Sequence, residues 1–597
     1  SLLHMHNNNS SHTGFGDGGR KQFIFLPKNY IILNFSNKGK PRQPVTITPL
    51  GEIRGAYNVT RRGRTFESYR GIKYAQPPVG DLRFQVSINN YMGVPRFWPP
   101  QPISQYSSPV DASKEGPACP LPAENYYVDE DCLTINVYTP LKNESGGYDA
   151  RPLRVLILFS FRTKPLPVIF FIHPGGFYTM TGRSDLAGPN YLLDRDIVNI
   201  FFLIFKRSST GDELAPGNNG FKDQVMALKW VQKNIAAFGG DPSKVTIAGC
   251  SAGSISVMLL MISPMSKGLF HRGISMSGSP VTKVRTPTDM YDLAVKQAEL
   301  LNCPTNNSRV IYDCLKTKPW QDFANSLPGF FEFGRFDPVG LWNAVVEKDF
   351  GQERFLPIDP MDAIREGKMH AVPWIVSQTE DEFYWFAYSV VTNDTLRNQM
   401  NAEWERIAPI SFMLPTENRA KAVKELKRAY LDDKPLQKDQ QSIDKLGRIY
   451  ADSIEAFPVN RVANLMCRHS PQPVWYYEFS YVGNHSHYED PKTGKPIKAA
   501  HHDDLIYLFS LPYRYPEIGL TGRDSLLVDR MTAIWYNFAR YGDPNPQPDT
   551  PEISGLSWPT MKPDKRTYLR IDDQLTLHQN LFEDRLQLWE QLYPIEY

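Results

Sequence analysis

The sequence has no apolar run long enough to cross a membrane as a helix. The longest mostly apolar stretch, residues 197–205, is far shorter than the ~18 apolar residues that such a helix needs. Residues 592–597 contain no apolar tail of the kind that precedes a lipid anchor, and residues 1–44 lack the pattern of a signal peptide. The sequence therefore predicts no membrane span.

An excess of either charge is also absent. The 597 residues include 66 Lys and Arg against 64 Asp and Glu, which gives a net charge of +2. Proteins that bind nucleic acid or anionic membranes through their overall field carry a clear surplus of basic residues. The composition therefore gives no reason to expect a nucleic-acid partner.

Cysteine is scarce, with six residues in the whole chain. Cys119 and Cys132 lie 13 positions apart, and Cys303 and Cys314 lie 11 apart, so both separations fit small disulfide loops. Six buried thiols in a cytosolic protein fit the same spacing. Glycosylation sequons favour a secreted protein instead. Outside residues 1–44 these sequons begin at Asn58, Asn143, Asn306, Asn393 and Asn484.

The chain divides into a tail and one large domain. Residues 1–44 are polar and of low complexity, so we expect a poorly ordered tail. The whole chain is 41% hydrophobic and 22% charged, which is ordinary for a globular protein. We find no internal repeat and interpret residues 45–597 as a single α/β domain.

Two continuous apolar runs identify the centre of a parallel sheet. Residues 167–173 and 245–249 are each mainly apolar, which is typical of strands buried on both faces. Residues 222–238 between them place apolar side chains at helical spacing. Strand, helix and strand in this order predict a doubly wound sheet. Further segments predict a hairpin over 45–55, strands over 134–138 and 374–376, and helices within 405–470 and over 531–540.

The motif that carries most chemistry is Gly-Cys-Ser-Ala-Gly at residues 249–253. It follows an apolar strand and precedes an apolar helix over 254–261, which is the context of a nucleophile elbow. Such a turn lifts a serine hydroxyl above the sheet, and its glycines allow neighbouring backbone to pack closely. An idle serine in a tight glycine turn is the simpler alternative. We predict that Ser251 is a nucleophile.

A second glycine motif, His-Pro-Gly-Gly-Phe, follows the first buried strand at residues 173–177. A loop of this kind directs backbone N–H groups at the oxyanion that forms during acyl transfer. Because proline has no N–H group, the expected donors are Gly175, Gly176 and Ala252. An ordinary turn at the end of a strand is the alternative.

A nucleophilic serine needs a base and an acid that orients the base. In α/β-hydrolases the chain order is serine, acid, histidine. The pair His501 and His502 stands out among the histidines after Ser251, and residues 380–382 supply three carboxylates just after a predicted strand. His485 and His487 with the later pair also allow a metal site, although no H-E-x-x-H pattern is present. The sequence alone leaves these assignments open.

Several motifs together resemble those of the type-B carboxylesterase family, which has the α/β-hydrolase fold, and of insect venom carboxylesterases in particular. They lie at residues 69–84, 130–138, 217–224, 238–242 and 542–544, and the resemblance covers roughly residues 45–595. The alignment implies Glu382 as the acid and His501 as the base, with His502 in place of a small residue. It also implies disulfides Cys119–Cys132 and Cys303–Cys314, and leaves Cys250 and Cys467 free.

The chain departs from the family at four places. Residues 151–162 look like an insertion, and residues 199–209 lack the glycines of the corresponding family run. Cys250 replaces a glutamate that many members carry before the nucleophile, and a buried thiol is neutral. The loop between Cys119 and Cys132 has no tryptophan of the kind that binds choline in cholinesterases. The last two differences argue against acetylcholine as the substrate.

The resemblance implies a serine carboxylic ester hydrolase that acts on a small ester and needs no metal or cofactor. A non-catalytic adhesion or binding protein on the same scaffold is the alternative, since fold does not fix function. A juvenile-hormone-type esterase is a third reading within the same chemistry. That group commonly has glutamine before the nucleophile, where this chain has Cys250.

Overall fold

The structure is a computed structural model that describes residues 43–79, 101–122, 127–141, 164–202 and 209–597. Almost all of the predicted tail, the segment 151–162 and the sequon at Asn143 lie outside the described residues. The other four predicted sequon asparagines, Asn58, Asn306, Asn393 and Asn484, are all exposed.

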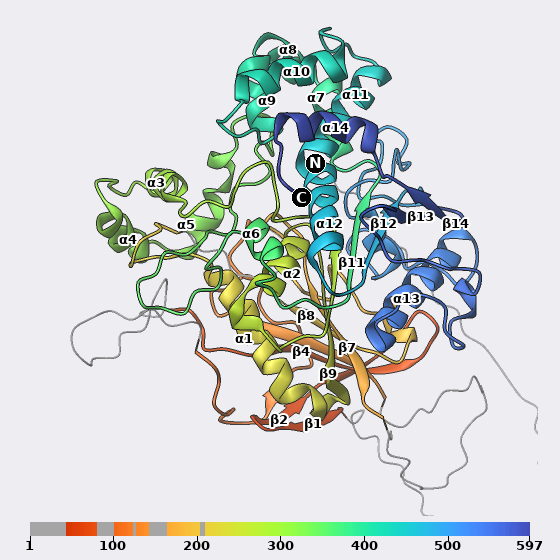
Figure 1. Ribbon diagram of the computed structural model, residues 1–597. Helices are drawn as coiled ribbons and strands as arrows, with labels where there is room; N and C mark the ends of the chain where they lie inside the picture. Colours follow the sequence, from red (N-terminus) through yellow and green to blue (C-terminus); the bar gives the residue numbers. More distant parts are fainter. Residues whose placement is uncertain (1–42, 80–100, 123–126, 142–163, 203–208) are drawn as a thin grey trace, which may run out of the picture. The chain divides into compact units, whose positions relative to one another are not determined.

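One large twisted sheet forms the centre of the described residues (Figure 1). In spatial order, every neighbouring pair of strands from β8 (Val198–Phe202) across to β13 (Thr567–Ile571) is parallel. The pairs closer to the two edges of the sheet are antiparallel. This mostly parallel arrangement is the predicted one. In spatial order the strands are β14 (Leu575–Gln579), β13 (Thr567–Ile571), β12 (Val474–Phe479), β11 (Trp374–Thr379), β10 (Arg272–Met276), β9 (Gly240–Cys250), β7 (Leu166–Ile172), β8 (Val198–Phe202), β6 (Thr134–Pro140), β4 (Thr65–Lys73) and β3 (Ala56–Val59).

A small second sheet contains strands from the first part of the described chain. It contains the predicted hairpin, in which β1 (Val45–Thr48) pairs antiparallel with β2 (Gly51–Arg54). β5 (Val110–Asp111) joins β2 in parallel. The run that departs from the family at residue 199 nevertheless begins as β8, which lies between β6 and β7.

Helices surround the sheet and extend beyond it. Their bounds are α1 (Asn219–Asn234), α2 (Ala252–Ile262), α3 (Tyr291–Leu300), α4 (Ser308–Thr317), α5 (Trp320–Asn325), α6 (Pro360–Arg365), α7 (Tyr384–Thr392), α8 (Asp394–Ala402), α9 (Trp404–Ser411), α10 (Arg419–Leu431), α11 (Gln440–Ala451), α12 (Phe457–His469), α13 (Arg523–Tyr541) and α14 (Glu583–Leu592). The predicted helical region 405–470 is thus four helices, and the helix predicted over 531–540 begins eight residues earlier.

Both faces of the central strands are buried, as their continuous apolar sequences predict. In β7, Val168 and Phe170 pack with residues of α1, α2 and α12 on one face. Ile169 and Phe171 pack with residues of α13 on the other face. Alternate side chains therefore belong to two different cores, which is why the strand has no polar positions.

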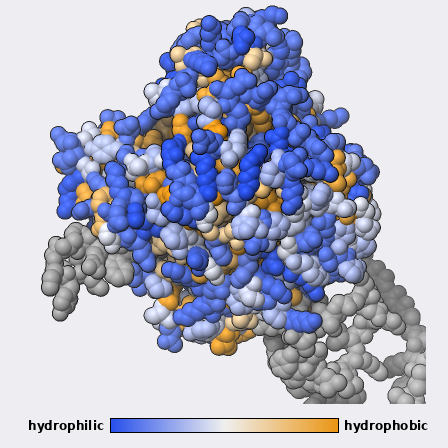
Figure 2. Space-filling model, viewed as in Figure 1, coloured by the Kyte–Doolittle hydropathy of each residue, from blue (hydrophilic) through white to orange (hydrophobic). Residues whose placement is uncertain are grey.

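A third core lies among the helices α7–α11 and α14, which group at the top of Figure 1. The exterior drawn in Figure 2 is mainly hydrophilic, with apolar residues in small scattered patches. No helix among the described residues is long and apolar enough to cross a membrane.

Both disulfides that the resemblance implies are present. Cys119 and Cys132 are bonded, with Cα atoms 5.1 Å apart, and Cys303 and Cys314 are bonded, with Cα atoms 5.8 Å apart. Cys250 is buried and free, and Cys467 is also free. The second bridge links the end of α3 to α4 within a small apolar cluster.

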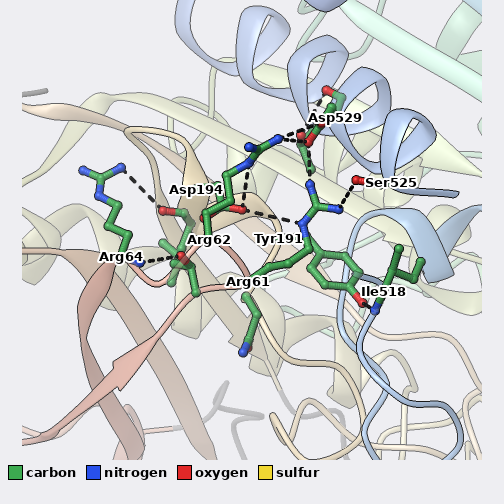
Figure 3. A network of polar contacts seen from close by, with 12 residues as sticks. Arg61, Arg62, Arg64, Tyr191, Asp194, Ile518, Ser525 and Asp529 are labelled. Atoms are coloured by element: carbon green, nitrogen blue, oxygen red, sulfur yellow. Dashed lines mark hydrogen bonds and ion pairs between the residues drawn. The ribbon is translucent and has the colours of Figure 1, made fainter. Parts of the chain in front are cut away.

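An ion-pair network ties the turn between β3 and β4 to α13 (Figure 3). Arg61 Nη2 lies 2.5 Å from Asp529 Oδ1, and Arg62 Nη2 lies 2.8 Å from both oxygens of the same carboxylate. The Arg61 side chain is only 2% exposed and also donates to Ser525 Oγ. Asp194 Oδ2 lies farther from Arg61, at 3.9 Å from Nε. A buried guanidinium depends strongly on its carboxylates, because removal of the nearer one leaves much of the buried charge uncompensated.

We predict that Asp529→Ala lowers the free energy of unfolding by about 3 kcal/mol. Urea denaturation of the purified protein measures this loss. Asp573→Ala is the matched control, since Asp573 pairs with Arg523 at the exposed start of α13, and we expect it to change the same quantity by less than about 1 kcal/mol. Equal effects of the two substitutions would contradict the account.

Candidate active site

Ser251 occupies the predicted sharp turn between β9 and α2. Its backbone has φ 57° and ψ −120°, a conformation that residues other than glycine rarely adopt. Its N–H donates to the Met276 carbonyl at 2.8 Å. A Cβ atom on Gly253 would lie 2.1 Å from the Ile172 carbonyl oxygen, and one on Gly249 would lie 2.4 Å from Gly253. The two glycines therefore allow β7, β9 and α2 to approach closely enough to form the turn.

Glu382 and His501 are brought together from distant parts of the chain. Glu382 lies just after β11, and His501 lies in the turn that precedes the short helix η7 (Asp503–Tyr507). His501 Nδ1 donates a hydrogen bond to Glu382 Oε2, and the side chains are 1% and 0% exposed, respectively. The carboxylate thus fixes the orientation of the imidazole and directs Nε2 away from the pair.

The second oxygen of Glu382 has its own donors. Oε1 accepts a hydrogen bond of 2.5 Å from Ser277 Oγ and one of 2.8 Å from the backbone N–H of Thr379. Ser277 directly follows β10, so three neighbouring elements hold this one carboxylate. Burial of a carboxylate is costly unless such partners satisfy its lone pairs.

The ring of Phe383 holds the imidazole from one side. It stacks on His501 with a centroid distance of 4.3 Å and an angle of 28°. Phe383 has φ 53°, and His502, whose ring lies 4.0 Å from His501, has φ 79°. Non-glycine residues at such angles are strained and concentrate at functional sites. Both neighbours therefore restrict the motion of His501.

His501 Nε2 is buried and has no hydrogen-bond partner among the residues that the structure describes. Ser251 and Phe383 line one cleft, which has a volume of about 210 Å³. The Ser251 hydroxyl makes no hydrogen bond to a described side chain. The arrangement thus contains an imidazole ring that is held at Nδ1 and has Nε2 without a partner, and a serine residue that lines the cleft.

The loop after β7 supplies the expected glycine turn. Gly175 has φ 119° and Gly176 has φ 59°, and the N–H groups of Tyr178 and Thr179 both donate to the Gly175 carbonyl. Gly176 and Ala252 line the cleft beside Ser251, whereas Gly175 does not. Among described residues, no backbone carbonyl accepts from the N–H groups of Gly175, Gly176 or Ala252. These groups remain available to an oxyanion.

Two groups close to the elbow are uncharged near neutral pH. Burial raises the pKa of the Cys250 thiol well above its usual range, and the negative charges of Asp504, Glu382 and Glu455 add to this effect. The burial of the free Cys250 thiol agrees with the expectation from the sequence. Burial also lowers the pKa of His173 to about 4, so this ring is a neutral neighbour of the glycine loop.

The histidines that allowed a metal site have other partners. His485 Nδ1 lies 3.3 Å from Glu489, and His487 Nδ1 lies 3.3 Å from Asp503. Within the described part of the chain, no group of three or more His, Cys, Asp or Glu side chains is placed to hold a metal ion.

The sequence analysis missed Ser277 and Phe383. Ser277 follows an apolar strand and precedes Gly278, whose Cβ would lie 2.4 Å from the Ser251 carbonyl oxygen. A serine and a glycine at the end of the next parallel strand are a usable signal, because such strand ends meet at one edge of the sheet. Nothing in the sequence marks Phe383, since its role depends on a residue 118 positions away.

Known proteins resemble this chain in sequence and in fold. The model of the carboxylesterase family matches residues 42–589. A juvenile hormone esterase of Tribolium castaneum is 30% identical over 93% of each chain, and venom carboxylesterase-6 of Apis mellifera is 32% identical over 91% of each chain. The crystal structure of juvenile hormone esterase from Manduca sexta has 26% identity and a TM-score of 0.76, and the match covers 93% of this chain and 100% of that one. The chain belongs to the carboxylesterase family and is a carboxylic ester hydrolase with the α/β-hydrolase fold.

Proposed function

We propose that the enzyme hydrolyses its ester through a triad of Ser251, His501 and Glu382 and a covalent acyl-enzyme. The observation that carries this proposal is the buried Glu382–His501 pair, which leaves His501 Nε2 without a partner. Ser251 contributes the hydroxyl that is open to the adjoining cleft. Nucleophile, base and orienting acid are the three parts that such catalysis requires.

In the first step His501 Nε2 takes the proton of the Ser251 hydroxyl while the oxygen attacks the ester carbonyl. The imidazolium forms beside Glu382, whose negative charge stabilises it. When the tetrahedral intermediate collapses, the alcohol leaves with the proton that His501 returns. A water molecule, deprotonated by His501, then attacks the acyl-enzyme. When this second tetrahedral intermediate collapses, the bond to Ser251 Oγ breaks, His501 returns the proton to that oxygen, and the carboxylic acid is released.

The developing oxyanion is stabilised by the backbone N–H groups of Gly175, Gly176 and Ala252. The glycine loop and the start of α2 hold these groups before the reaction begins, so no reorganisation is needed in the transition state. The loss of one donor of this kind typically costs about 3 kcal/mol. The free N–H groups and the position of two of these residues on the cleft support this assignment.

The substrate is a small carboxylic ester with a largely apolar body. The cleft wall supports this class, because apolar side chains such as Ile255, Leu259, Trp342 and Met413 predominate in it. The similarity to juvenile hormone esterases extends to the fold, but Cys250 stands where that group commonly has glutamine. The adhesion alternative is weakened because all three triad positions carry the required residue types, and Glu382 and His501 are hydrogen-bonded.

The enzyme acts outside the cell. Two disulfides support this location, since such bonds persist in oxidising compartments. Four exposed sequon asparagines, at positions 58, 306, 393 and 484, are accessible to glycosylation. The relative from Apis mellifera is named as a venom carboxylesterase. Digestion of the native protein with an N-glycosidase tests this location, and an unchanged mass would argue against it.

We predict that Ser251→Ala lowers kcat for a p-nitrophenyl ester by about 10⁶-fold, since removal of the nucleophile alone abolishes most triad catalysis. Hydrolysis rates of the purified variant measure this loss, and an unchanged circular dichroism spectrum verifies the fold. A residual rate close to that of the natural enzyme would rule out Ser251 as the nucleophile.

We predict that Glu382→Gln lowers kcat by about 10⁴-fold, because an amide neither stabilises the imidazolium nor fixes its tautomer. Glu380→Gln is the matched control at a neighbouring carboxylate. Glu380 is partly exposed and pairs with Arg570, so its substitution leaves kcat nearly unchanged. If Glu380→Gln lowered kcat as strongly as Glu382→Gln, the assignment of the acid would be wrong.

A further inference from the structure

A carboxyl group lies in the wall of the cleft that contains Ser251. It belongs to Glu455, which sits in the π-helical turn η6 (Asp452–Ala456) between α11 and α12. Only 6% of the residue is exposed. π-Helical turns are rare in proteins, and those that are present often lie at functional sites.

The Glu455 side chain has no hydrogen bond or ion pair to a described residue, although its neighbours in η6 do. Asp452 accepts from Tyr430 Oη at 2.7 Å and from Arg585 Nε at 2.7 Å, and Ser453 Oγ donates to the Phe412 carbonyl. Burial raises the pKa of the Glu455 carboxyl well above its usual range. A buried polar group without a partner normally carries a penalty of about 1–3 kcal/mol.

A lysine in the same cleft forms no ion pair with Glu455. Lys283 lines the same cleft, but its ammonium donates to the Ser453 carbonyl at 2.6 Å and lies 5.6 Å from the centre of the Trp589 ring. Burial lowers the pKa of Lys283 to about 7. The cleft therefore holds a carboxyl group and an amine that do not form an ion pair with each other.

We propose that Glu455 is a specificity-determining residue that hydrogen-bonds a hydroxyl group carried by the ester substrate. A hydroxyl donates and accepts, so it pairs with the carboxyl group in either protonation state. The inference rests on the proposed function, because it requires Ser251 to react in this cleft.

The test uses pairs of esters that differ by a hydroxyl in place of a terminal methyl group. The acyl side is probed with p-nitrophenyl ω-hydroxyalkanoates of four, six and eight carbons, and the alcohol side with monoacetates of diols of the same lengths. For each pair, the preference is the kcat/KM of the hydroxyl ester divided by that of the methyl ester. For at least one pair we expect this ratio to be about 10- to 100-fold lower in Glu455→Leu than in the natural enzyme. Glu455→Gln retains part of the ratio, since an amide still forms hydrogen bonds.

The same variants give two independent readouts. Glu455→Leu removes an unpaired buried polar group, so we expect its unfolding temperature to rise. Glu380→Gln, at a carboxylate that pairs with Arg570 and does not line the cleft, changes neither the ratio nor the preference for any chain length. Labelling with a fluorophosphonate reports whether Ser251 is still activated.

The outcomes separate the two claims. The role of Glu455 would be overturned if both the natural enzyme and Glu455→Leu were labelled and had the same ratio for every pair. The triad would then remain intact. A natural enzyme that is folded but not labelled would overturn the triad, and the role of Glu455 with it.

Discussion

The buried pair of Glu382 and His501 is the interaction on which the site depends. A carboxylate with no exposed surface is stable only when each oxygen has donors. Those donors come from the end of β10, the end of β11 and the turn before η7. The parallel register of the central strands therefore allows a buried carboxylate at this end of the sheet. That carboxylate in turn orients the imidazole of His501.

The strained backbone angles around the site also depend on the packing of the central sheet. Ser251, Ser277, Phe383 and His502 all have positive φ, and each lies at or just beyond the end of a strand or before η7. Such conformations persist only where the surrounding structure over-determines them. Here the close approach of backbone at Gly253 and the two apolar cores on either face of the sheet supply that constraint. The strain thus places a hydroxyl and an imidazole at one end of the sheet.

Much of this arrangement could be predicted from the sequence, because it is encoded locally. The continuous apolar runs at 167–173 and 245–249 identify central strands, and the glycines around Ser251 identify the turn between β9 and α2. The choice among residues 380–382, and between His501 and His502, depended on resemblance to a family. Ser277, Phe383 and Glu455 escaped prediction, since contacts between segments about 100 or more positions apart define their roles. No local pattern distinguishes Phe383 or Glu455 from ordinary core or surface residues, whereas Ser277 and Gly278 at the end of a parallel strand carry a weak signal.

The central claim is that His501 and Glu382 activate Ser251. The most direct measurement is reaction of the purified protein with a fluorophosphonate probe, followed by mass spectrometry of the labelled peptide. The account predicts a single label on Ser251, lost when the protein is unfolded before the reaction. A folded protein that carries no label, or carries it on another serine, would contradict the account.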